Sequence, residues 1–165
     1  MRRDDGSAGS PQGDPVYLTE EGFKRLREKL ARLKRALPEF INEAQRTAAF
    51  GDRSDNAEYK DAKSTLRRTH RQILSIENQI KRVVIINSGP NASSTVQLGS
   101  TIVLEQDDGT RKTFQILGSH ETNPDKGRIS YKSPLGAALM NHAQGDIVTI
   151  QTKSGSQKYR ILEIR

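Results

Sequence analysis

Apolar residues recur in alternating steps of three and four along two segments of the chain. In the first segment they are Phe23, Leu26, Leu30, Leu33, Leu37, Phe40 and Ala44. In the second they are Ala62, Leu66, Thr69, Ile73, Ile76, Ile80 and Val83. This spacing is the a/d seam of a helix that packs along another helix. Because only a short connection separates the segments, we expect an antiparallel helical hairpin.

Each arm of this hairpin has roughly 30 residues, which at about 1.5 Å of rise per residue gives a rod about 45 Å long. Thr19, followed by Glu20 and Glu21, is expected to cap the start of the first arm. Pro38 lies inside the first seam, where it removes a helix hydrogen bond and crowds the preceding turn. We therefore expect a kink or a local break at Pro38.

The connection between the arms is acidic, and residues 51–59 read GDRSDNAEY. Gly51 suits the left-handed position just past the first arm, and Asp55 with Glu58 forms a capping-box pattern for the second arm. Asp52 and Asp55 would then stand at the end of a long rod, which suggests a device that carries acid groups to a distant place. The alternative is structural, because Asp is a preferred turn and N-cap residue.

The composition changes at residues 87–94, NSGPNASS, which are expected to form a linker. Short runs rich in β-branched and aromatic residues follow, separated by turn signals, and they predict five strands. These runs are 100–105, 111–117, 127–132, 147–152 and 157–164. Residues 133–140, with Pro134 at the first helical position, predict one short helix. Residues 95–165 are therefore expected to form a small α+β domain.

Positive charge is concentrated on the hairpin. The chain has a formal net charge of +7, and its arms carry eight Lys/Arg against five Asp/Glu over residues 19–49 and seven against two over 60–82. Residues 51–58, in contrast, contain three acids and one Arg. A basic surface of this kind favours an anionic partner such as nucleic acid. Solvated faces of a coiled coil explain the same pattern without any partner.

Other features of the composition exclude several classes of protein. The chain has no cysteine, which excludes disulfides, zinc ribbons and thiol nucleophiles and fits a reducing cytoplasm. It lacks both an apolar run of the ~20 residues that a membrane span needs and a signal-peptide core, so we expect a cytoplasmic protein without membrane contact.

The three histidines, His70, His120 and His142, do not have metal-ligand spacing and are expected at the surface. Residues 1–15 are expected to be a disordered tail.

Several motifs together resemble the bacterial Gre family of transcript cleavage factors. The segment GDRSDNAEY is preceded by a helix that opens with LTEEGFKRL, and the later runs ISYKSPLGAAL and GDIVTIQT resemble the C-terminal domain of the family. The resemblance covers residues 16–165, and Pro38 has a counterpart in the first helix of many members. It implies a coiled-coil hairpin over 16–86 and a C-terminal domain over 95–165 that is FKBP-like and docks on RNA polymerase.

The resemblance also implies a mechanism in which the hairpin enters the secondary channel of the polymerase. Asp52 and Asp55 would help to hold the second Mg²⁺ of the polymerase active site, and the polymerase would then cleave its own backtracked nascent RNA. The chain would act as a monomeric cofactor, with Mg²⁺ held mainly by the polymerase. Residues implied to support the tip are Ser54, Asn56, Ala57, Glu58 and Tyr59. Candidates for contact with the extruded RNA are Arg46, Lys60, Lys63 and Arg67.

One residue departs from the family pattern, because most members have Glu where this chain has Asp55. A misplacement near 1 Å can cost about 10²-fold in catalysis. Stimulation of RNA cleavage therefore has an alternative, a regulator that binds the channel and inhibits or modulates the polymerase with little cleavage. Two further alternatives are an autonomous enzyme such as a prolyl isomerase, for which the C-terminal region is poor in aromatics, and a coiled-coil adaptor that binds nucleic acid.

Overall fold

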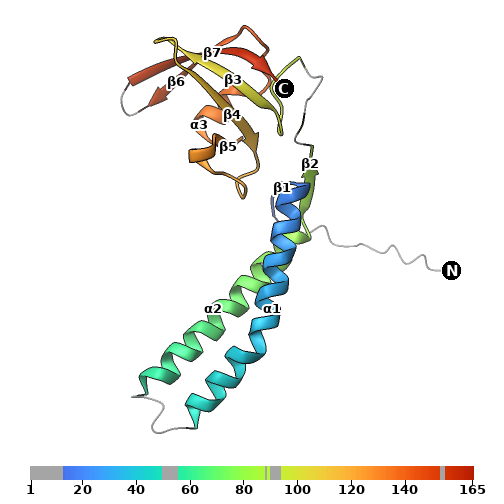
Figure 1. Ribbon diagram of the computed structural model, residues 1–165, viewed down its shortest axis with the longest axis vertical. Helices are drawn as coiled ribbons and strands as arrows, with labels where there is room; N and C mark the ends of the chain where they lie inside the picture. Colours follow the sequence, from blue (N-terminus) through green and yellow to red (C-terminus); the bar gives the residue numbers. More distant parts are fainter. Residues whose placement is uncertain (1–12, 50–55, 88, 90–93, 153–154) are drawn as a thin grey trace, which may run out of the picture.

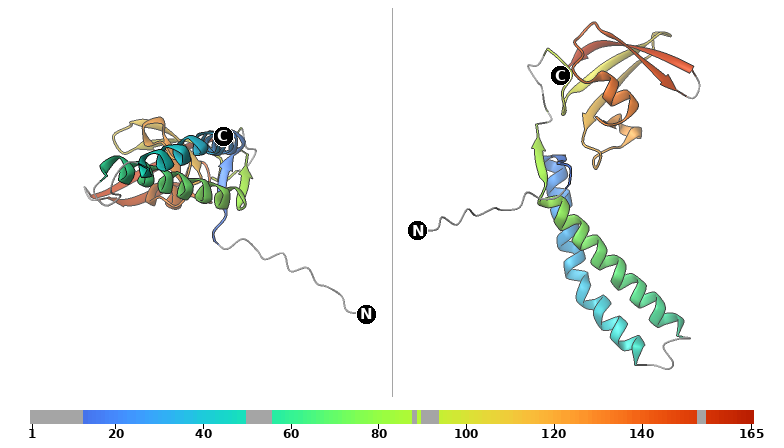
Figure 2. Two further views of the ribbon diagram at one scale, coloured as in Figure 1. Left: turned by 90° about the horizontal axis from the view of Figure 1, so that it is seen from below. Right: turned by 180° about the vertical axis from the view of Figure 1, so that it is seen from behind.

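The chain folds into a helical rod with a small sheet domain at one end (Figure 1). The computed structural model describes residues 13–49, 56–87, 89, 94–152 and 155–165. The rod consists of α1, Glu20–Ala48, and α2, Ala57–Ile80. Figure 2 shows the same rod from below and from behind, projecting away from the sheet domain. The expected fold class, an antiparallel helical hairpin followed by a small α+β domain, is confirmed.

The two arms pack along the predicted seam. On α2 the buried residues are Ala62, Thr69, Ile73 and Ile76. The apolar seam residues of α1 are half-buried, because a rod of two helices has no third layer to cover them. An ion pair between Lys34 Nζ and Glu77 Oε1, at 2.7 Å, joins the two arms on their outer side. Among the described residues, no helix is long and apolar enough to span a bilayer.

The ends of the helices match the sequence predictions only in part. Thr19 is the N-cap of α1, as expected, and its Oγ1 accepts a hydrogen bond from the Gly22 N–H at 3.0 Å. Of the kink or local break predicted at Pro38, the break does not occur, since α1 continues through this residue. Pro38 is exposed and lacks the N–H that would bond to the Lys34 carbonyl, so the helix loses one hydrogen bond there. Val83 was predicted as the last seam position of the second helix, but α2 ends at Ile80.

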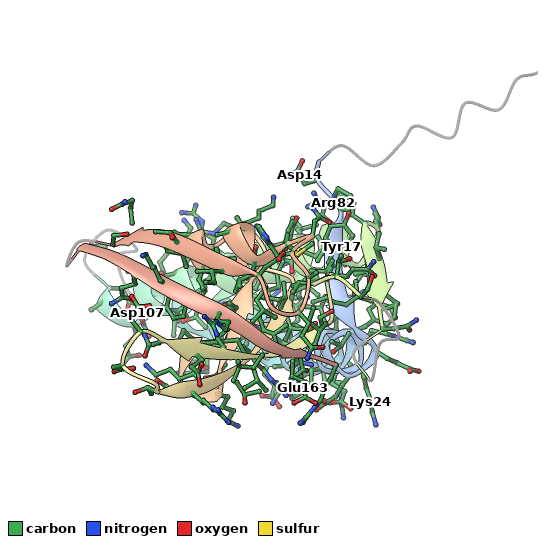
Figure 3. All side chains as sticks on the ribbon, turned by 90° about the horizontal axis from the view of Figure 1, so that it is seen from above. Asp14, Tyr17, Lys24, Arg82, Asp107 and Glu163 are labelled. Atoms are coloured by element: carbon green, nitrogen blue, oxygen red, sulfur yellow. The ribbon has the colours of Figure 1, made fainter. Side chains whose placement is uncertain are left out.

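Val83 belongs instead to a two-stranded parallel sheet at the base of the hairpin, which the sequence analysis did not predict. It pairs β1, Val16–Thr19, with β2, Val83–Ile86, so that the strand entering the hairpin runs beside the strand leaving it. Val16, Leu18 and Ile86 are buried in this base. Figure 3 shows Asp14, Arg82 and Tyr17 close together on this side of the molecule, where the Arg82 guanidinium donates to the Asp14 carbonyl at 2.8 Å.

Five strands among the described residues form the sheet of the C-terminal domain, in the order β5-β4-β3-β7-β6. Their bounds are β3 Thr101–Gln106, β4 Arg111–Leu117, β5 Arg128–Ser130, β6 Ile147–Thr152 and β7 Gly155–Ile164. Neighbouring strands are antiparallel except β4 and β5, which are parallel. A 3₁₀ turn, η1 Pro124–Lys126, precedes β5, and α3, Pro134–Leu139, follows it.

The five strands and the helix correspond to the predicted runs. The largest differences are at β5, which is shorter than predicted, and at β7, which begins two residues earlier. Ser133 caps α3, with its Oγ accepting from the Gly136 N–H at 3.1 Å, and Pro134 occupies the first helical position as predicted. The core beneath the sheet is apolar, and its buried residues are Val96, Ile102, Leu104, Ile116, Leu139, Val148, Ile150, Tyr159 and Ile161.

A buried carboxylate joins the two parts of the molecule. Glu121 lies in the loop after β4, and its side chain is 4% exposed. Its Oε2 accepts from the Thr19 N–H at 2.5 Å, and its Oε1 accepts from Thr19 Oγ1 at 2.7 Å and from Arg25 Nη2 at 3.1 Å. A Cβ at Gly22 would overlap the Glu121 carboxylate, and a Cβ at Gly118 would overlap the carbonyl of Tyr17. Both glycines therefore permit the close approach of the hairpin base to the C-terminal domain.

We predict that Glu121→Ala lowers the free energy of unfolding by about 1–3 kcal/mol, because it leaves the buried Thr19 N–H without an acceptor. Glu121→Gln keeps the size of the side chain and one acceptor oxygen, and it should lose less. Urea denaturation of both variants measures the difference. Because the chain has no cysteine, a pair of introduced cysteines carrying spin labels, one on α1 and one on β4, reports the distance between the two parts.

The distance distribution should broaden in Glu121→Ala. A distribution as narrow as that of the parent protein, with unchanged stability, would show that the carboxylate does not hold the two parts together.

Candidate functional site at the hairpin tip

The candidate site lies where α1 ends and α2 begins, at the end of the rod farthest from the sheet domain (Figure 1). Asp52, Ser54 and Asp55, and Gly51 beside them, lie outside the described residues. They belong to the connection between Ala49 and Asn56, and both of these flanking residues are described. The structure therefore fixes the two points from which the acidic connection starts and to which it returns.

Asn56 ties the two arms together at this end. Its side-chain Nδ2 donates to the carbonyl of Thr47, near the end of α1, at 3.0 Å. Its Oδ1 accepts from the Tyr59 N–H at 3.0 Å, which makes Asn56 the N-cap of α2. One amide side chain thus satisfies a backbone donor of the second helix and a backbone acceptor of the first. It closes the hairpin directly below the acidic connection.

The predicted capping box of Asp55 and Glu58 is wrong. The helix is capped one residue later, by Asn56, and the third position of the helix is Tyr59 rather than a Glu. Asn and Asp are about equally good N-cap residues, so intrinsic preference does not separate Asp55 from Asn56. The bond from Asn56 to Thr47 favours the later start, and only the paired helices provide that bond.

The last turn of α1 is held by polar contacts that the sequence analysis did not single out. Thr47 is 1% exposed, and its Oγ1 donates to the carbonyl of Glu43 at 2.8 Å. Arg46 and Glu43 form a two-point ion pair, with Nε to Oε2 at 3.0 Å and Nη2 to Oε1 at 2.7 Å. The hydrogen bonds from Arg46 lower the pKa of the Glu43 carboxyl, and those to Glu43 raise the pKa of Arg46. Both charges persist through the neutral range.

A cavity of about 410 Å³ lies between the arms next to this turn, and three carboxylates line it. They belong to Glu43, Glu58 and Asp61, with Arg46 as the accompanying cation. The nearby charge of Glu58 on the other arm adds to the raised pKa of Arg46, after the larger effect of Glu43. Negative charge at the tip is therefore not confined to the connection.

The RNA-contact candidates divide into two kinds. Lys60, Lys63 and Arg67 follow one another at steps of three and four on α2, which places them on one face of that helix. Lys63 Nζ also lies over the ring of Tyr59, 5.3 Å from its centroid. Arg46 lies on the other helix, and its guanidinium is already paired with Glu43. Lys60, Lys63 and Arg67 are thus the RNA-contact candidates that form no ion pair within the described residues.

Within the described residues, no three His, Cys, Asp or Glu side chains lie close enough together to hold a metal ion. His70 and His120 are exposed, and the Nδ1 of His142 lies 3.1 Å from the Oδ2 of Asp146.

Of the residues predicted to support the tip, Ala57 and Glu58 are exposed at the start of α2, and Tyr59 is half-buried. Glu43 and Thr47 were missed because an i to i+3 ion pair and a Thr in the last turn of a helix carry no signal of a site.

We predict that Asn56→Ala destabilises the hairpin by about 0.5–2 kcal/mol, because the N-cap of α2 is lost. Asn56→Asp separates the two roles of the side chain, since a carboxylate can accept from the Tyr59 N–H but cannot donate to the Thr47 carbonyl. Hydrogen exchange should therefore quicken at the Tyr59 amide in Asn56→Ala but not in Asn56→Asp. If the two variants exchange and unfold alike, the cap is not the main role of Asn56.

Comparisons with known proteins agree over nearly the whole chain. The family model described as "Transcription elongation factor, N-terminal" matches residues 16–85, and the one described as "Transcription elongation factor, GreA/GreB, C-term" matches residues 91–165. The chain is 39% identical to transcription elongation factor GreA of Chloroflexus aurantiacus, over 92% of this chain and 98% of the relative. It is 38% identical to GreA of Clostridioides difficile, over 90% and 94%.

Among solved structures, the chain is similar to the GreA factor homolog 1 (Gfh1) protein of Thermus thermophilus, at 30% identity and a TM-score of 0.42, covering 92% of this chain and 99% of that one. A GreA/GreB factor from Nitrosomonas europaea is 17% identical with a TM-score of 0.40, covering 92% and 98%. The two family models cover both the hairpin and the sheet domain in their order along the chain. This chain belongs to the GreA/GreB family of transcription elongation factors.

Proposed function

We propose that this chain inserts its hairpin into the secondary channel of RNA polymerase and stimulates the polymerase's own cleavage of backtracked nascent RNA. The observation that carries the proposal is the geometry of the rod. The acidic connection joins α1 to α2 at the end of the rod that is far from the sheet domain, where a hydrogen bond from Asn56 to Thr47 ties the two helices together. A rod of about 45 Å can place these acids in a site that the globular domain cannot enter.

The donor set of the tip fits a hard cation. Asp52 and Asp55 offer carboxylate oxygens, which are the ligands that Mg²⁺ prefers, and they would complete a Mg²⁺ site held mainly by the polymerase. When bound, the metal supplies Lewis-acid activation of water and of the scissile phosphate. The part played by this chain is to deliver the two carboxylates and to hold them in place. The chain itself is then a cofactor and not an enzyme.

The basic face of α2 supports the same proposal. Lys60, Lys63 and Arg67 lie on one side of the helix that leads away from the tip. An RNA 3′ end displaced past the acids would meet these cations, which attract phosphates without regard to sequence. The sheet domain, joined to the base through Glu121, would remain outside the channel and bind the polymerase surface. A monomer is sufficient for this arrangement.

The first test is Asp52→Ala, with Asp55→Ala beside it, in a stalled elongation complex with backtracked RNA. Each variant should reduce the rate of RNA cleavage by at least about 10²-fold and leave polymerase binding nearly unchanged, because misplaced or missing ligands cost rate and not docking. Glu28→Ala is the matched control. It removes one exposed carboxylate from α1 far from the tip and should cleave like the parent. Parent-like cleavage by either aspartate variant would refute the assignment.

The second test concerns the shorter acid. Asn56, and not Asp55, is the N-cap of α2. Asp55→Glu should therefore leave the melting temperature of the hairpin nearly unchanged. Its longer side chain should raise the cleavage rate at limiting Mg²⁺, with a smaller gain at saturating Mg²⁺. A Mg²⁺ titration of both proteins measures this. A reduced rate at every concentration would contradict the geometric account.

The alternative function is a regulator that occupies the channel with little cleavage. The observation that favours it is the Asp at position 55, where the carboxylate reaches less far than that of a Glu. The same assay decides between the two functions. Slowed elongation without short RNA fragments would establish the regulator, and release of the fragments would establish the cleavage factor.

A further inference from the structure

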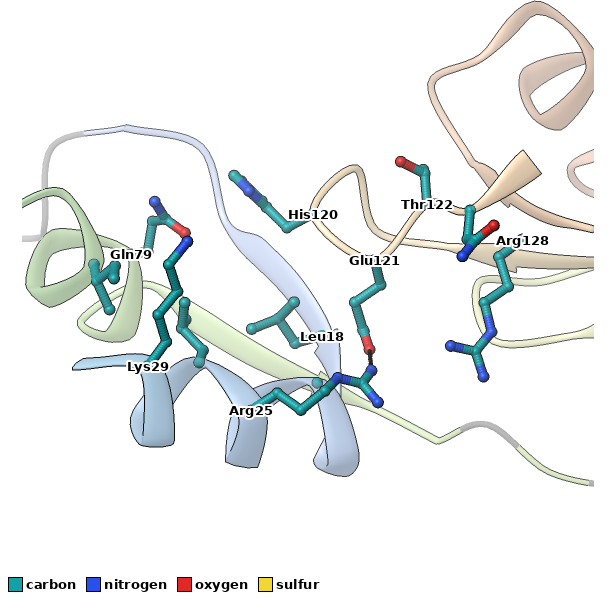
Figure 4. A pocket seen from close by; sticks show the side chains of 12 residues that line it. Leu18, Arg25, Lys29, Gln79, His120, Glu121, Thr122 and Arg128 are labelled. Carbon is teal, nitrogen blue, oxygen red and sulfur yellow. Dashed lines mark hydrogen bonds and ion pairs between the residues drawn. The ribbon is translucent and has the colours of Figure 1, made fainter. Parts of the chain in front are cut away.

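A cavity of about 470 Å³ lies between the base of the hairpin and the sheet domain (Figure 4). Its walls come from three places in the sequence: the first turns of α1, the last turn of α2, and the segment from the loop after β4 to the start of β5. The volume is in the range of about 300–1,000 Å³ that is usual for small-molecule sites. It lies at the opposite end of the rod from the acidic tip.

The cavity has an excess of positive charge. Lys29 of α1, Arg25 of α1 and Arg128 of β5 all line it, and Glu121 is the one carboxylate among its lining residues. Glu121 is already neutralised, since its oxygens accept from Thr19 and from Arg25. Among the described residues, neither Lys29 nor Arg128 has a carboxylate within ion-pair distance. Two cations from different parts of the molecule therefore face one cavity without a counter-charge.

Neutral hydrogen-bonding groups surround these cations. The exposed imidazole of His120 and the exposed side chain of Thr122 lie on the loop after β4, and both line the cavity. The Thr122 hydroxyl donates to the Ser119 carbonyl at 3.5 Å. Asn123 uses its Oδ1 to accept from the Lys126 N–H, which leaves its amide nitrogen as a donor toward a ligand. In Figure 4 the side chains of Lys29 and Arg128 lie on opposite sides of the Arg25–Glu121 pair. The groups offered are mainly donors, which suits an anion with several oxygens.

We propose that this cavity binds a small anion that carries two or three linked phosphates, with Arg128 and Lys29 as its main ligands. A planar guanidinium binds phosphate oxygens in pairs, and a lysine adds a point charge. In this proposal the two ends of a di- or triphosphate group contact the two side chains that line the cavity from opposite parts of the molecule.

Such a ligand would connect the two parts of the molecule. Lys29 belongs to the hairpin and Arg128 to the sheet domain, so an anion held by both adds a second link beside Glu121. Because the anion binds only when the hairpin and the sheet domain are in this relative position, its binding stabilises that position. Binding of a small molecule at this site would thus fix the orientation of the hairpin relative to the sheet domain. It does not depend on the proposed cleavage role, because it involves no residue of the tip.

The test is a calorimetric titration of the full chain at about 0.15 M salt, where weak surface attraction is screened. Sodium tripolyphosphate and ATP are the two probes, and they separate a free polyphosphate from a nucleotide as the source of the phosphates. We expect saturable binding of one molecule per chain. Tighter binding of ATP would assign a nucleotide, and equal or tighter binding of tripolyphosphate would assign the phosphate chain alone.

Lys29→Gln and Arg128→Gln should each weaken binding by about tenfold or more. Arg32→Gln and Lys158→Gln are the matched controls. Each removes one exposed cation from the same helix or the same domain, outside the cavity, and each should bind within about twofold of the parent. In the unchanged protein, amide NMR shifts on adding tripolyphosphate should be largest at residues 120–123 and near Lys29.

Two results would overturn the proposal. The first is absence of saturation below about 1 mM of either probe. The second is an equal loss of affinity in the controls and in the cavity variants, or NMR shifts spread over both arms, because general attraction to a basic chain would then explain the binding. Circular dichroism of each variant confirms that it is folded before its affinity is compared.

Discussion

The arrangement of this molecule depends on the contact between Thr19 and Glu121. Thr19 ends β1, caps α1 and donates both its N–H and its hydroxyl to the buried carboxylate. A single residue therefore fixes where the base sheet stops, where the hairpin starts and where the C-terminal domain attaches. The bare backbone at Gly22 and Gly118 is needed for the approach, because a Cβ at either position would overlap the opposite part. The carboxylate is compensated by Arg25, so its burial does not leave an unpaired charge.

The hairpin itself is thinly packed, and its ends are reinforced by polar contacts. Most of its apolar seam on α1 is only half-buried, as two helices alone cannot enclose their contact. At one end the parallel pair of β1 and β2 joins the two arms, and at the other end Asn56 joins them through Thr47. The middle carries the ion pair of Lys34 and Glu77. A slender rod with closed ends suits a part that must reach a distant site and hold its tip in place.

The chemistry of the two ends differs. The tip combines the carboxylates of the connection with those of Glu43, Glu58 and Asp61, whereas the base offers Lys29 and Arg128 without counter-charges. The ligands that we propose follow these charges: a cation held by a partner at the tip, and an anion at the base. Because the two sites share no residue, each can be tested without disturbing the other. The first site is proposed from the acidic residues of the connection, and the second from the geometry of the junction.

The sequence by itself determined the periodic elements. Steps of three and four predicted both helices, and runs of β-branched residues between turn signals predicted the five strands and α3, because these patterns reflect local geometry. It also predicted the Thr19 cap. The tertiary structure decided the start of α2, where Asn56 caps the helix and also bonds to Thr47. It also decided that α1 continues through Pro38. It alone decided the pairing of β1 with β2, the burial of Glu121 and the position of Lys29 and Arg128 at one cavity. These contacts join residues about 70 to 100 positions apart, and no local pattern encodes which distant residues will meet.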